Sequence, residues 1–155
     1  MFLGEELGGR PTKKKLYLDG VADYERMATD RNFQNGIDRV VEGAKRYRIA
    51  LMCSEYDPLD CHRCLLVGRA LAKRGIEVRH ILSKGKMVSQ REIEARLIQQ
   101  CGHGGEDFFA KGDERLAQAY RERSRQVSYR KPKDISSTTT GAKLDRNLNN
   151  RVYKV

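Results

Sequence analysis

Apolar residues recur at helical spacing over much of the first 130 residues, and short unbroken apolar runs separate the helical patterns. The helical spacing predicts helices over residues 23–30, 32–47 and about 60–73, and further helices that begin at Ser89 and Asp113. Ser89 and Glu92 match the capping box, in which the two side chains satisfy free amides at a helix start.

Two apolar runs predict strands. The run Ile49–Cys53 is short and unbroken, which is typical of a strand covered on both faces of a parallel sheet. Glu77–Leu82 alternates as a second strand, and residues 83–88 are expected to form a connection around Gly85. The order strand, helix, strand predicts an α/β domain over residues 1–130, with a partial parallel sheet and helices packed on it. Because two strands make a poor sheet, further strands are expected upstream or from a partner.

Most of the net positive charge of the chain lies at its C-terminal end. Residues 121–155 hold ten Lys or Arg and three Asp or Glu, which gives +7 of the total net charge of +10. From about residue 131 the composition turns to Ser, Thr and Asn without apolar periodicity, and this predicts a disordered basic tail over residues 131–155. The basic segment could bind nucleic acid, or it could be a solvated extension that keeps the protein soluble.

The remaining composition favours a cytoplasmic protein. No apolar stretch approaches the roughly 20 residues of a membrane span, so no membrane partner is expected. The acidic N-terminus lacks the basic and apolar regions of a signal peptide. Four cysteines are expected to be free thiols or metal ligands in a reducing compartment. No cofactor and no particular oligomeric state is predicted.

The segment from residue 48 to residue 63, RIALMCSEYDPLDCHR, carries the candidate chemistry. Cys53 ends the first predicted strand, and Cys61, His62 and Arg63 open the helix that follows. A helix start presents free amides that bind anions, and Arg63 could grip a phosphate in a bidentate manner. The same field is expected to lower the pKa of Cys61, and His62 could act as an acid or base, so both are catalytic candidates.

A purely structural interpretation of this segment stays open. In it Cys53 is a buried apolar side chain, and Asp57, Asp60 and Arg63 brace the loop by ion pairs. Covalent catalysis by a thiol is a further alternative, but a phosphatase loop of the Cys-x5-Arg type is excluded because Leu59 stands where the arginine would be needed.

A zinc site is a further alternative for the cysteines. Cys61, Cys64, Cys101 and His103 are soft donors, although their spacing is not that of a zinc knuckle, and incidental thiols are the favoured interpretation. A redox role for the Cys61-x-x-Cys64 pair is weaker. His80 is expected to be a hydrogen-bonded residue of the second strand that could also point into the cleft.

Four segments together resemble the DUF488 family of domains of unknown function. Residues 3–10 are similar to the LGxxLGGR loop of the family, and the segment from Ala50 to Arg63 is similar to its ALMCxExxPxxCHR signature. Residues 78–81 resemble its following strand, and Ala119-Tyr120 its closing helix. The resemblance implies an α/β fold but no settled activity. It also implies N-terminal truncation, since members begin with a strand, a helix and a second strand before the LGGR loop.

These observations favour a cytoplasmic domain that binds a phosphate-bearing ligand, either a nucleotide or a nucleic acid, with catalysis left open. The predicted ligand-binding residues are Cys53, Asp57, Cys61, His62 and Arg63, with Glu5 and Arg10 above the pocket. One alternative is a non-catalytic nucleic-acid-binding module that uses the basic C-terminal segment. Another is a truncated structural remnant without a ligand.

Overall fold

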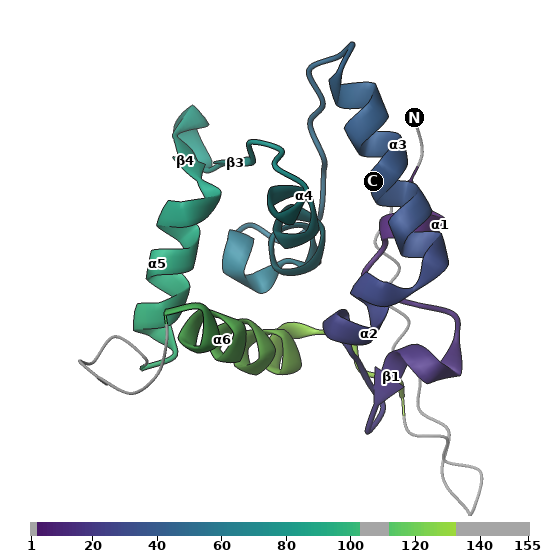
Figure 1. Ribbon diagram of the computed structural model, residues 1–155. Coiled ribbons are helices and arrows are strands. Elements are labelled where there is room, and N and C mark those ends of the chain that lie inside the picture. Colours follow the sequence, from purple (N-terminus) through teal and green to yellow (C-terminus); the bar gives the residue numbers. More distant parts are fainter. Residues whose placement is uncertain (1–2, 103–111, 133–155) are drawn as a thin grey trace, which may run out of the picture.

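The computed structural model describes residues 3–102 and 112–132, and helices dominate it (Figure 1). Its α-helices are α1 (Gly4–Leu7), α2 (Tyr24–Thr29), α3 (Arg31–Ala44), α4 (Arg69–Lys73), α5 (Gln90–Gln100) and α6 (Gly112–Val127). The shorter elements are the 3-10 turns η1 (Lys14–Leu16), η2 (Pro58–Asp60) and η4 (Ser83–Gly85), and the π-helix η3 (Arg63–Gly68). Figure 1 shows α3 and α5 on opposite sides of α4, with α6 lying across the bottom.

The strands form two small antiparallel hairpins. In the first, β1 (Tyr17–Leu18) pairs with β2 (Val21–Ala22), and in the second, β3 (Arg79–Ile81) pairs with β4 (Met87–Ser89). The predicted partial parallel sheet is therefore wrong. The second predicted strand does form, as β3, but it pairs with the segment that the sequence predicts as a connection. A hairpin between neighbouring segments closes a much shorter loop than a crossover does, so it costs less chain entropy.

The apolar run Ile49–Cys53 lies in an extended loop and not in a strand. Within residues 3–102 and 112–132, no backbone group forms a backbone hydrogen bond with residues 48–56. The side chain of Met52 is 93% exposed, so the surface that neighbouring elements would cover in a sheet is open. The prediction of a strand here is wrong because a strand needs a partner, and an apolar run by itself does not supply one.

Side-chain caps set the starts of the main helices. The carboxylate of Asp23 accepts hydrogen bonds from amides at the start of α2, and Asp30 does the same for α3. The predicted capping box is confirmed at α5, where the side chains of Ser89 and Glu92 each bond to the backbone of the other. Each cap satisfies amides that have no partner within the helix, which fixes where the helix begins.

The helix predicted over residues 60–73 forms from His62 to Lys73, as the π-helix η3 followed by α4. Its wider first part buries every residue from Cys64 to Gly68. Short π-helical insertions of this kind are frequent at functional sites. After α4 the chain turns at Gly75, whose φ of +77° suits glycine, so the predicted stop is confirmed.

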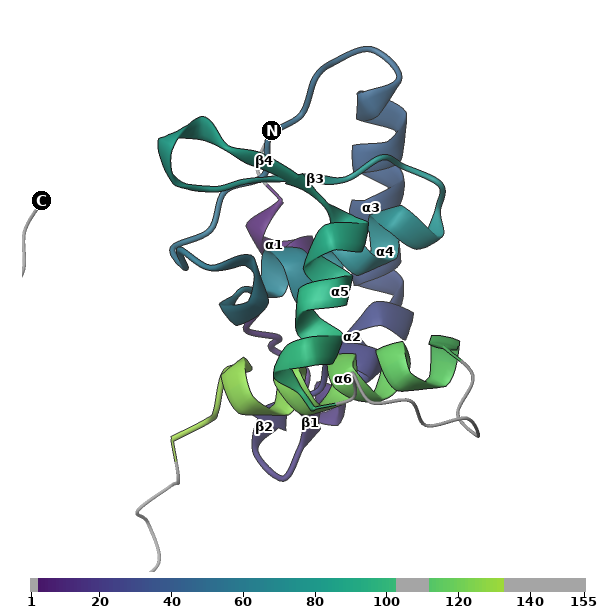
Figure 2. The same cartoon turned by 90° about the vertical axis from the view of Figure 1, so that its left-hand side faces the viewer.

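A single apolar core joins the helices. Figure 2 shows α5 in front of α4 with α6 crossing below, and contacts link α5 to α6 and α1 to α3. The largest fully buried side chains of the core include Ile37, Leu59, Leu65, Leu97 and Tyr120. Burying side chains of this size contributes about 1.5–3 kcal/mol each. The helices are therefore held by shared burial rather than by the two small hairpins.

Across residues 3–102 and 112–132, no helix combines the length and the apolar character that crossing a membrane requires. Residues 133–155 lie outside the described part of the chain, so the disorder of the predicted tail, 131–155, and the domain boundary at residue 130 stay predictions.

Candidate functional site

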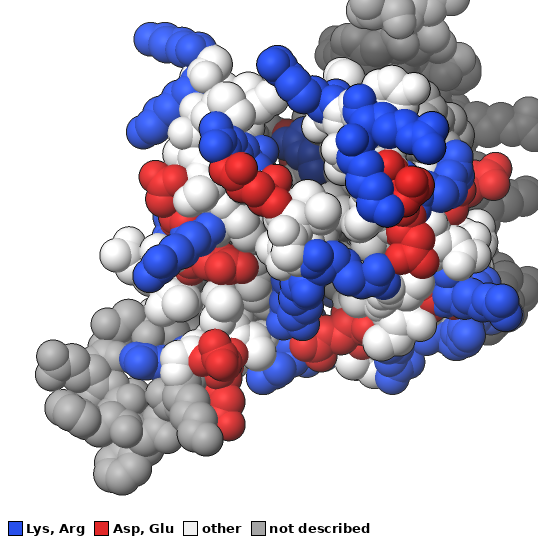
Figure 3. Space-filling view, turned by 45° about the horizontal axis from the view of Figure 1, so that its top comes forward, with Lys and Arg blue, Asp and Glu red and all other residues white. Residues whose placement is uncertain are grey.

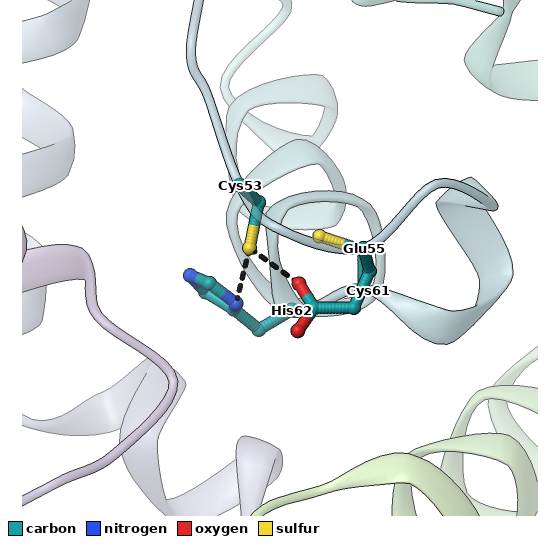
Figure 4. A group of neighbouring side chains, drawn as sticks. All are labelled: Cys53, Glu55, Cys61 and His62. Carbon is teal, nitrogen blue, oxygen red and sulfur yellow. Dashed lines mark hydrogen bonds between the residues drawn. The ribbon is translucent and has the colours of Figure 1, made fainter. Parts of the chain in front are cut away.

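The loop after α3 turns back at η2, so that its extended part around Cys53 lies beside the helix start at His62. The Asp57 carboxylate accepts a hydrogen bond of 2.8 Å from the Leu59 amide and so begins η2. This turn returns the chain to its own extended part, and Cys53 Sγ lies 3.3 Å from Nδ1 of His62 (Figure 4). The predicted proximity of Cys53 and the helix start is confirmed, although Cys53 ends a loop and not a strand.

Four side chains converge at this point: Cys53, Glu55, Cys61 and His62, which we name the thiol cluster. One ligand-type atom from each lies within 4.8 Å of the others. Cys53 Sγ donates a hydrogen bond of 2.6 Å to Glu55, whose other oxygen accepts one of 3.0 Å from Ser54. Sequence reasoning missed Glu55. The available signal was its spacing from Cys53, because residues two apart on an extended chain point to the same side.

Burial and hydrogen bonds set the pKa values of the cluster. Burial raises the pKa of Cys61 to about 12, with a further contribution from Cys53. This is opposite to the lowered pKa that the helix start predicts, because the Cys61 side chain is fully buried. The hydrogen bond from Cys53 lowers the pKa of Glu55 to about 2. Burial also lowers the pKa of His62, against the opposing charge of Glu55.

A side chain of the loop itself, the Cys61 sulfur, caps the start of η3. The amide of Arg63, one of the groups expected to bind an anion, donates a hydrogen bond of 3.3 Å to Sγ of Cys61. The sulfur therefore takes a position that a phosphate oxygen would need. An anion near this loop is better served by the guanidinium of Arg63 than by the backbone of the helix.

Ion pairs brace the loop, as the structural interpretation requires, but with different partners. Asp57 pairs with Arg96 of α5, and Asp60 pairs with Arg123 of α6. The guanidinium of Arg123 also donates a hydrogen bond of 3.0 Å to the carbonyl of Leu59. The loop is thus tied to two helices, and Arg63 is not part of this bracing.

The LGGR loop reaches the site through a glycine. A Cβ atom on Gly9 would lie only 2.9 Å from Cγ of His62, so the backbone of this loop packs directly on the imidazole ring. The two residues predicted above the pocket have other contacts. The Glu5 carbonyl accepts a hydrogen bond of 3.3 Å from Asn32, and the Arg10 guanidinium lies 5.0 Å from the centre of the Tyr129 ring. Their role as ligand-binding residues stays a prediction.

A large cavity lies beside the loop, and Arg63 lines it. Its volume is about 850 Å³, and we name it the arginine-lined cavity after Arg48, Arg63 and Arg79. Its apolar wall comes from α3, α4, the extended loop, the segment before β3 and the β3–β4 hairpin. Figure 3 shows a hollow on this side of the molecule with Lys and Arg side chains around it. Glu77, the acidic residue of the lining, pairs with Arg79 at 2.6 Å.

His80 also borders this cavity, and it belongs to a buried polar network. Its Nε2 lies 2.7 Å from Oε1 of Gln90, and the amide of Gln90 donates a hydrogen bond of 2.7 Å to the hydroxyl of Tyr120. The Tyr120 hydroxyl in turn donates one of 2.8 Å to Glu94. The prediction that His80 is a hydrogen-bonded strand residue is confirmed.

Within the part of the chain that the structure describes, Cys64 and Cys101 do not join Cys61 in a group of metal-ligand side chains. Cys64 is fully buried on η3, and Sγ of Cys101 lies 3.7 Å from the carbonyl of Ala119, while His103 lies outside the described residues. In residues 3–102 and 112–132, the cluster with metal-ligand geometry is the thiol cluster, which shares Cys61 with the earlier set.

Part of the basic C-terminal segment folds back on the domain. Arginines of α6 pair with carboxylates of other elements: Arg121 with Glu25, Arg123 with Asp60 and Arg125 with Asp19. These charges are therefore partly neutralised within the chain, which weakens the case for a nucleic-acid module based on this segment.

Residues 3–70 match the model of the domain of unknown function DUF488. The match confirms the resemblance, and it contains the LGGR loop, the whole thiol cluster and Arg63. It does not extend to β3 or α6, and truncation relative to the family stays a prediction. Neither a curated protein nor a solved structure matches the chain significantly.

Proposed function

We propose that the protein binds a phosphate-bearing ligand of nucleotide size in the arginine-lined cavity, with Arg63 as the main anchor. The observation that carries the proposal is the charge balance of the cavity. Of its three arginines, Arg79 is paired with Glu77, whereas no carboxylate in the described residues forms an ion pair with Arg48 or Arg63. Arg63 makes one long contact of 3.5 Å, to the carbonyl of Leu51. A guanidinium with free donors binds phosphate oxygens well.

The shape and the walls of the cavity support a ligand with a second, less polar part. A volume of about 850 Å³ is within the range of small-molecule sites. Its larger apolar lining side chains are Val40, Ile49, Leu51, Met52, Leu71, Ile76, Val78, Ile81 and Met87. An apolar wall with a few charged groups suits a nucleotide, whose base is flat and whose phosphates are charged. The four free thiols support the cytoplasmic location expected from the sequence.

The proposed binding does not require the thiol cluster, which lies next to the cavity, to catalyse a reaction. Cys53, Asp57, Cys61 and His62 remain predicted ligand-binding residues, and Cys61 and His62 remain candidates for catalysis. The structure-based support for binding comes from Arg63 and Arg48. The nucleic-acid alternative instead predicts binding that falls steeply with salt and that is lost when the basic segment, residues 121–155, is deleted.

A thermal-shift titration of the full chain tests the proposal. Nucleoside mono-, di- and triphosphates, pyrophosphate and inorganic phosphate are compared, and we expect at least one nucleotide to raise the melting temperature. Arg63→Ala should weaken that ligand about 10- to 100-fold, since a hydrogen bond to a charged group is worth about 1.5–3 kcal/mol.

Arg46→Ala is the matched control. Arg46 is exposed, lies two residues before Arg48 and does not line the cavity, so this change removes the same charge without touching the site. Equal loss of binding in both variants, or no shift with any phosphate compound, would contradict the proposed function.

A further inference from the structure

The thiol cluster has the composition of a metal site. It offers two thiols, one imidazole and one carboxylate, all from a single loop of ten residues. We propose that Cys53, Glu55, Cys61 and His62 bind one divalent cation of the zinc class. This site is separate from the arginine-lined cavity, and it does not depend on the binding of a phosphate-bearing ligand there.

The distances suit four-coordinate zinc. Bond lengths of about 2.3 Å to sulfur and about 2.0–2.2 Å to nitrogen and oxygen place tetrahedral ligand atoms roughly 3.3–3.8 Å apart. The four ligand-type atoms of the cluster lie within 4.8 Å of one another. The most widely separated pair therefore closes by about 1–1.5 Å to complete a tetrahedron, a movement that side-chain rotation supplies. Figure 4 shows Cys53, Glu55 and His62 turned toward a common centre, with the Cys61 sulfur beside them.

The donor types select the metal. Sulfur and imidazole ligands favour zinc and other borderline ions, whereas Mg²⁺ and Ca²⁺ require mainly oxygen ligands. On binding, each thiol loses its proton to solvent, two metal–sulfur bonds form, and no oxidant or reductant takes part. Glu55 is exposed, so a metal ion can enter from solvent on the side of this carboxylate.

Neighbouring groups already orient the ligands. The Arg63 amide donates a hydrogen bond to Sγ of Cys61, and the Ser54 hydroxyl donates one to the Glu55 carboxylate. The backbone at Gly9 packs against the His62 ring and holds it in place. Second-shell contacts of this kind hold metal ligands in position and reduce the reorganisation that binding requires.

A metal ion would also explain how the loop keeps its shape. Residues 48–56 make no backbone hydrogen bond within the described parts of the chain, yet Cys53 and Glu55 from this stretch meet Cys61 and His62 of the helix start. A metal bridge between the two ends of the loop would replace the missing strand partner as a source of order.

Metal analysis of the full chain, purified under reducing conditions, tests the site directly. We expect one zinc ion per chain after dialysis against excess zinc and then against metal-free buffer. Substitution by Co²⁺ should give intense visible bands of a tetrahedral ion together with sulfur-to-cobalt charge transfer. This spectrum is read on the wild-type chain, so it does not depend on whether any variant folds.

Variants then assign the ligands. Cys53→Ser and His62→Gln should weaken zinc binding by more than about 100-fold, because even second-shell changes cost about 10–100-fold. Glu55→Gln should cost less, since water can replace an exposed carboxylate. Cys101→Ser is the matched control, because Cys101 is also a partly buried thiol but lies outside the cluster. Circular dichroism verifies that each variant is folded.

Two results would overturn the proposal: a wild-type chain that retains no zinc and gives no thiolate spectrum with cobalt, or a Cys101→Ser variant that loses as much affinity as Cys53→Ser. Arg63→Ala, which tests the cavity, should leave the zinc content unchanged. Failure of the metal site and failure of the phosphate site are therefore distinguishable.

Discussion

The thiol cluster and the buried network of His80, Gln90 and Tyr120 contact the same helix at its two ends. They differ in where their side chains come from and in whether every polar group has a partner within the protein. The thiol cluster surrounds the start of η3, and its four side chains come from one loop. The buried network packs near the end of η3, where a Cβ on Gly68 would lie 3.0 Å from the Gln90 side chain. Its members come from three elements, namely His80 from β3, Gln90 from α5 and Tyr120 from α6.

This difference separates a structural histidine from a candidate ligand. His80 is 5% exposed, and its bond to Gln90 belongs to a chain of bonds that ends on the Glu94 carboxylate. His62 faces a thiol and stands beside a second thiol and an exposed carboxylate. Buried polar groups that are fully paired stabilise a fold, whereas convergent donors that solvent reaches on one side, here at Glu55, can exchange their partners for a ligand.

The largest difference in stability between the two clusters is expected when Gln90, the central residue of the buried network, is replaced. Gln90→Ala leaves the buried imidazole of His80 without its side-chain partner and the Tyr120 hydroxyl with Glu94 alone, so we expect it to lower the free energy of unfolding by about 2–4 kcal/mol. Chemical denaturation measures this loss. Cys53→Ala, measured without metal, should cost less than about 1 kcal/mol because its contacts lie within one exposed loop.

Gln99→Ala is the control for Gln90→Ala, because Gln99 lies on the same helix but is exposed. Equal destabilisation by Gln90→Ala and Cys53→Ala would remove the distinction between the two clusters.

Acidification should act on the buried network through His80. Burial lowers the pKa of His80 in the folded protein, and Arg63 and Arg96 act in the same direction, while Gln90 and Glu94 oppose them. Below the ordinary histidine pKa of about 6.5 the unfolded chain binds a proton that the folded chain resists. Stability is therefore present above that pH and falls as the pH drops.

The measurement is the melting temperature of the metal-free chain between about pH 7.5 and pH 5.5, a window that brackets the ordinary histidine pKa. We expect a decrease of several degrees, and His80→Gln should reduce the slope because glutamine carries no titratable proton. An unchanged slope in this variant would show that His80 does not control the response.

The smallest expected effect concerns the contact between the LGGR loop and the thiol cluster. In Gly9→Ala the new Cβ would lie 2.9–3.1 Å from three atoms of the His62 side chain, so the ring has to move. We expect a loss of about 1 kcal/mol in the free energy of unfolding, at the low end for overpacking because the ring lies near the surface. Zinc affinity should fall about tenfold, as for a second-shell change.

Gly112→Ala serves as the control for Gly9→Ala, since a Cβ at Gly112 meets no atom within 4 Å. If Gly9→Ala changes neither stability nor zinc affinity, the glycine loop does not position His62.

The sequence predicted the local features of the candidate site well and the distant ones poorly. The approach of Cys53 to His62 follows from a short loop with an Asp-Pro turn, which brings its own ends together. The packing of Gly9 on His62 joins residues far apart in the chain, and no local pattern indicates it. Glu55 stood within the signature but was overlooked, because an exposed carboxylate in a loop is ordinary until its neighbours are known.

What the sequence by itself determined is the set of longer helices and the capping box at Ser89, together with the residues of the signature. Helices and caps depend on contacts within about four residues, so composition and spacing are sufficient to place them. The strand pairing was decided by the tertiary structure, which joined β3 to β4 and left Ile49–Cys53 unpaired. It also decided the direction of the Cys61 pKa, because burial is the sum of contacts from the whole fold.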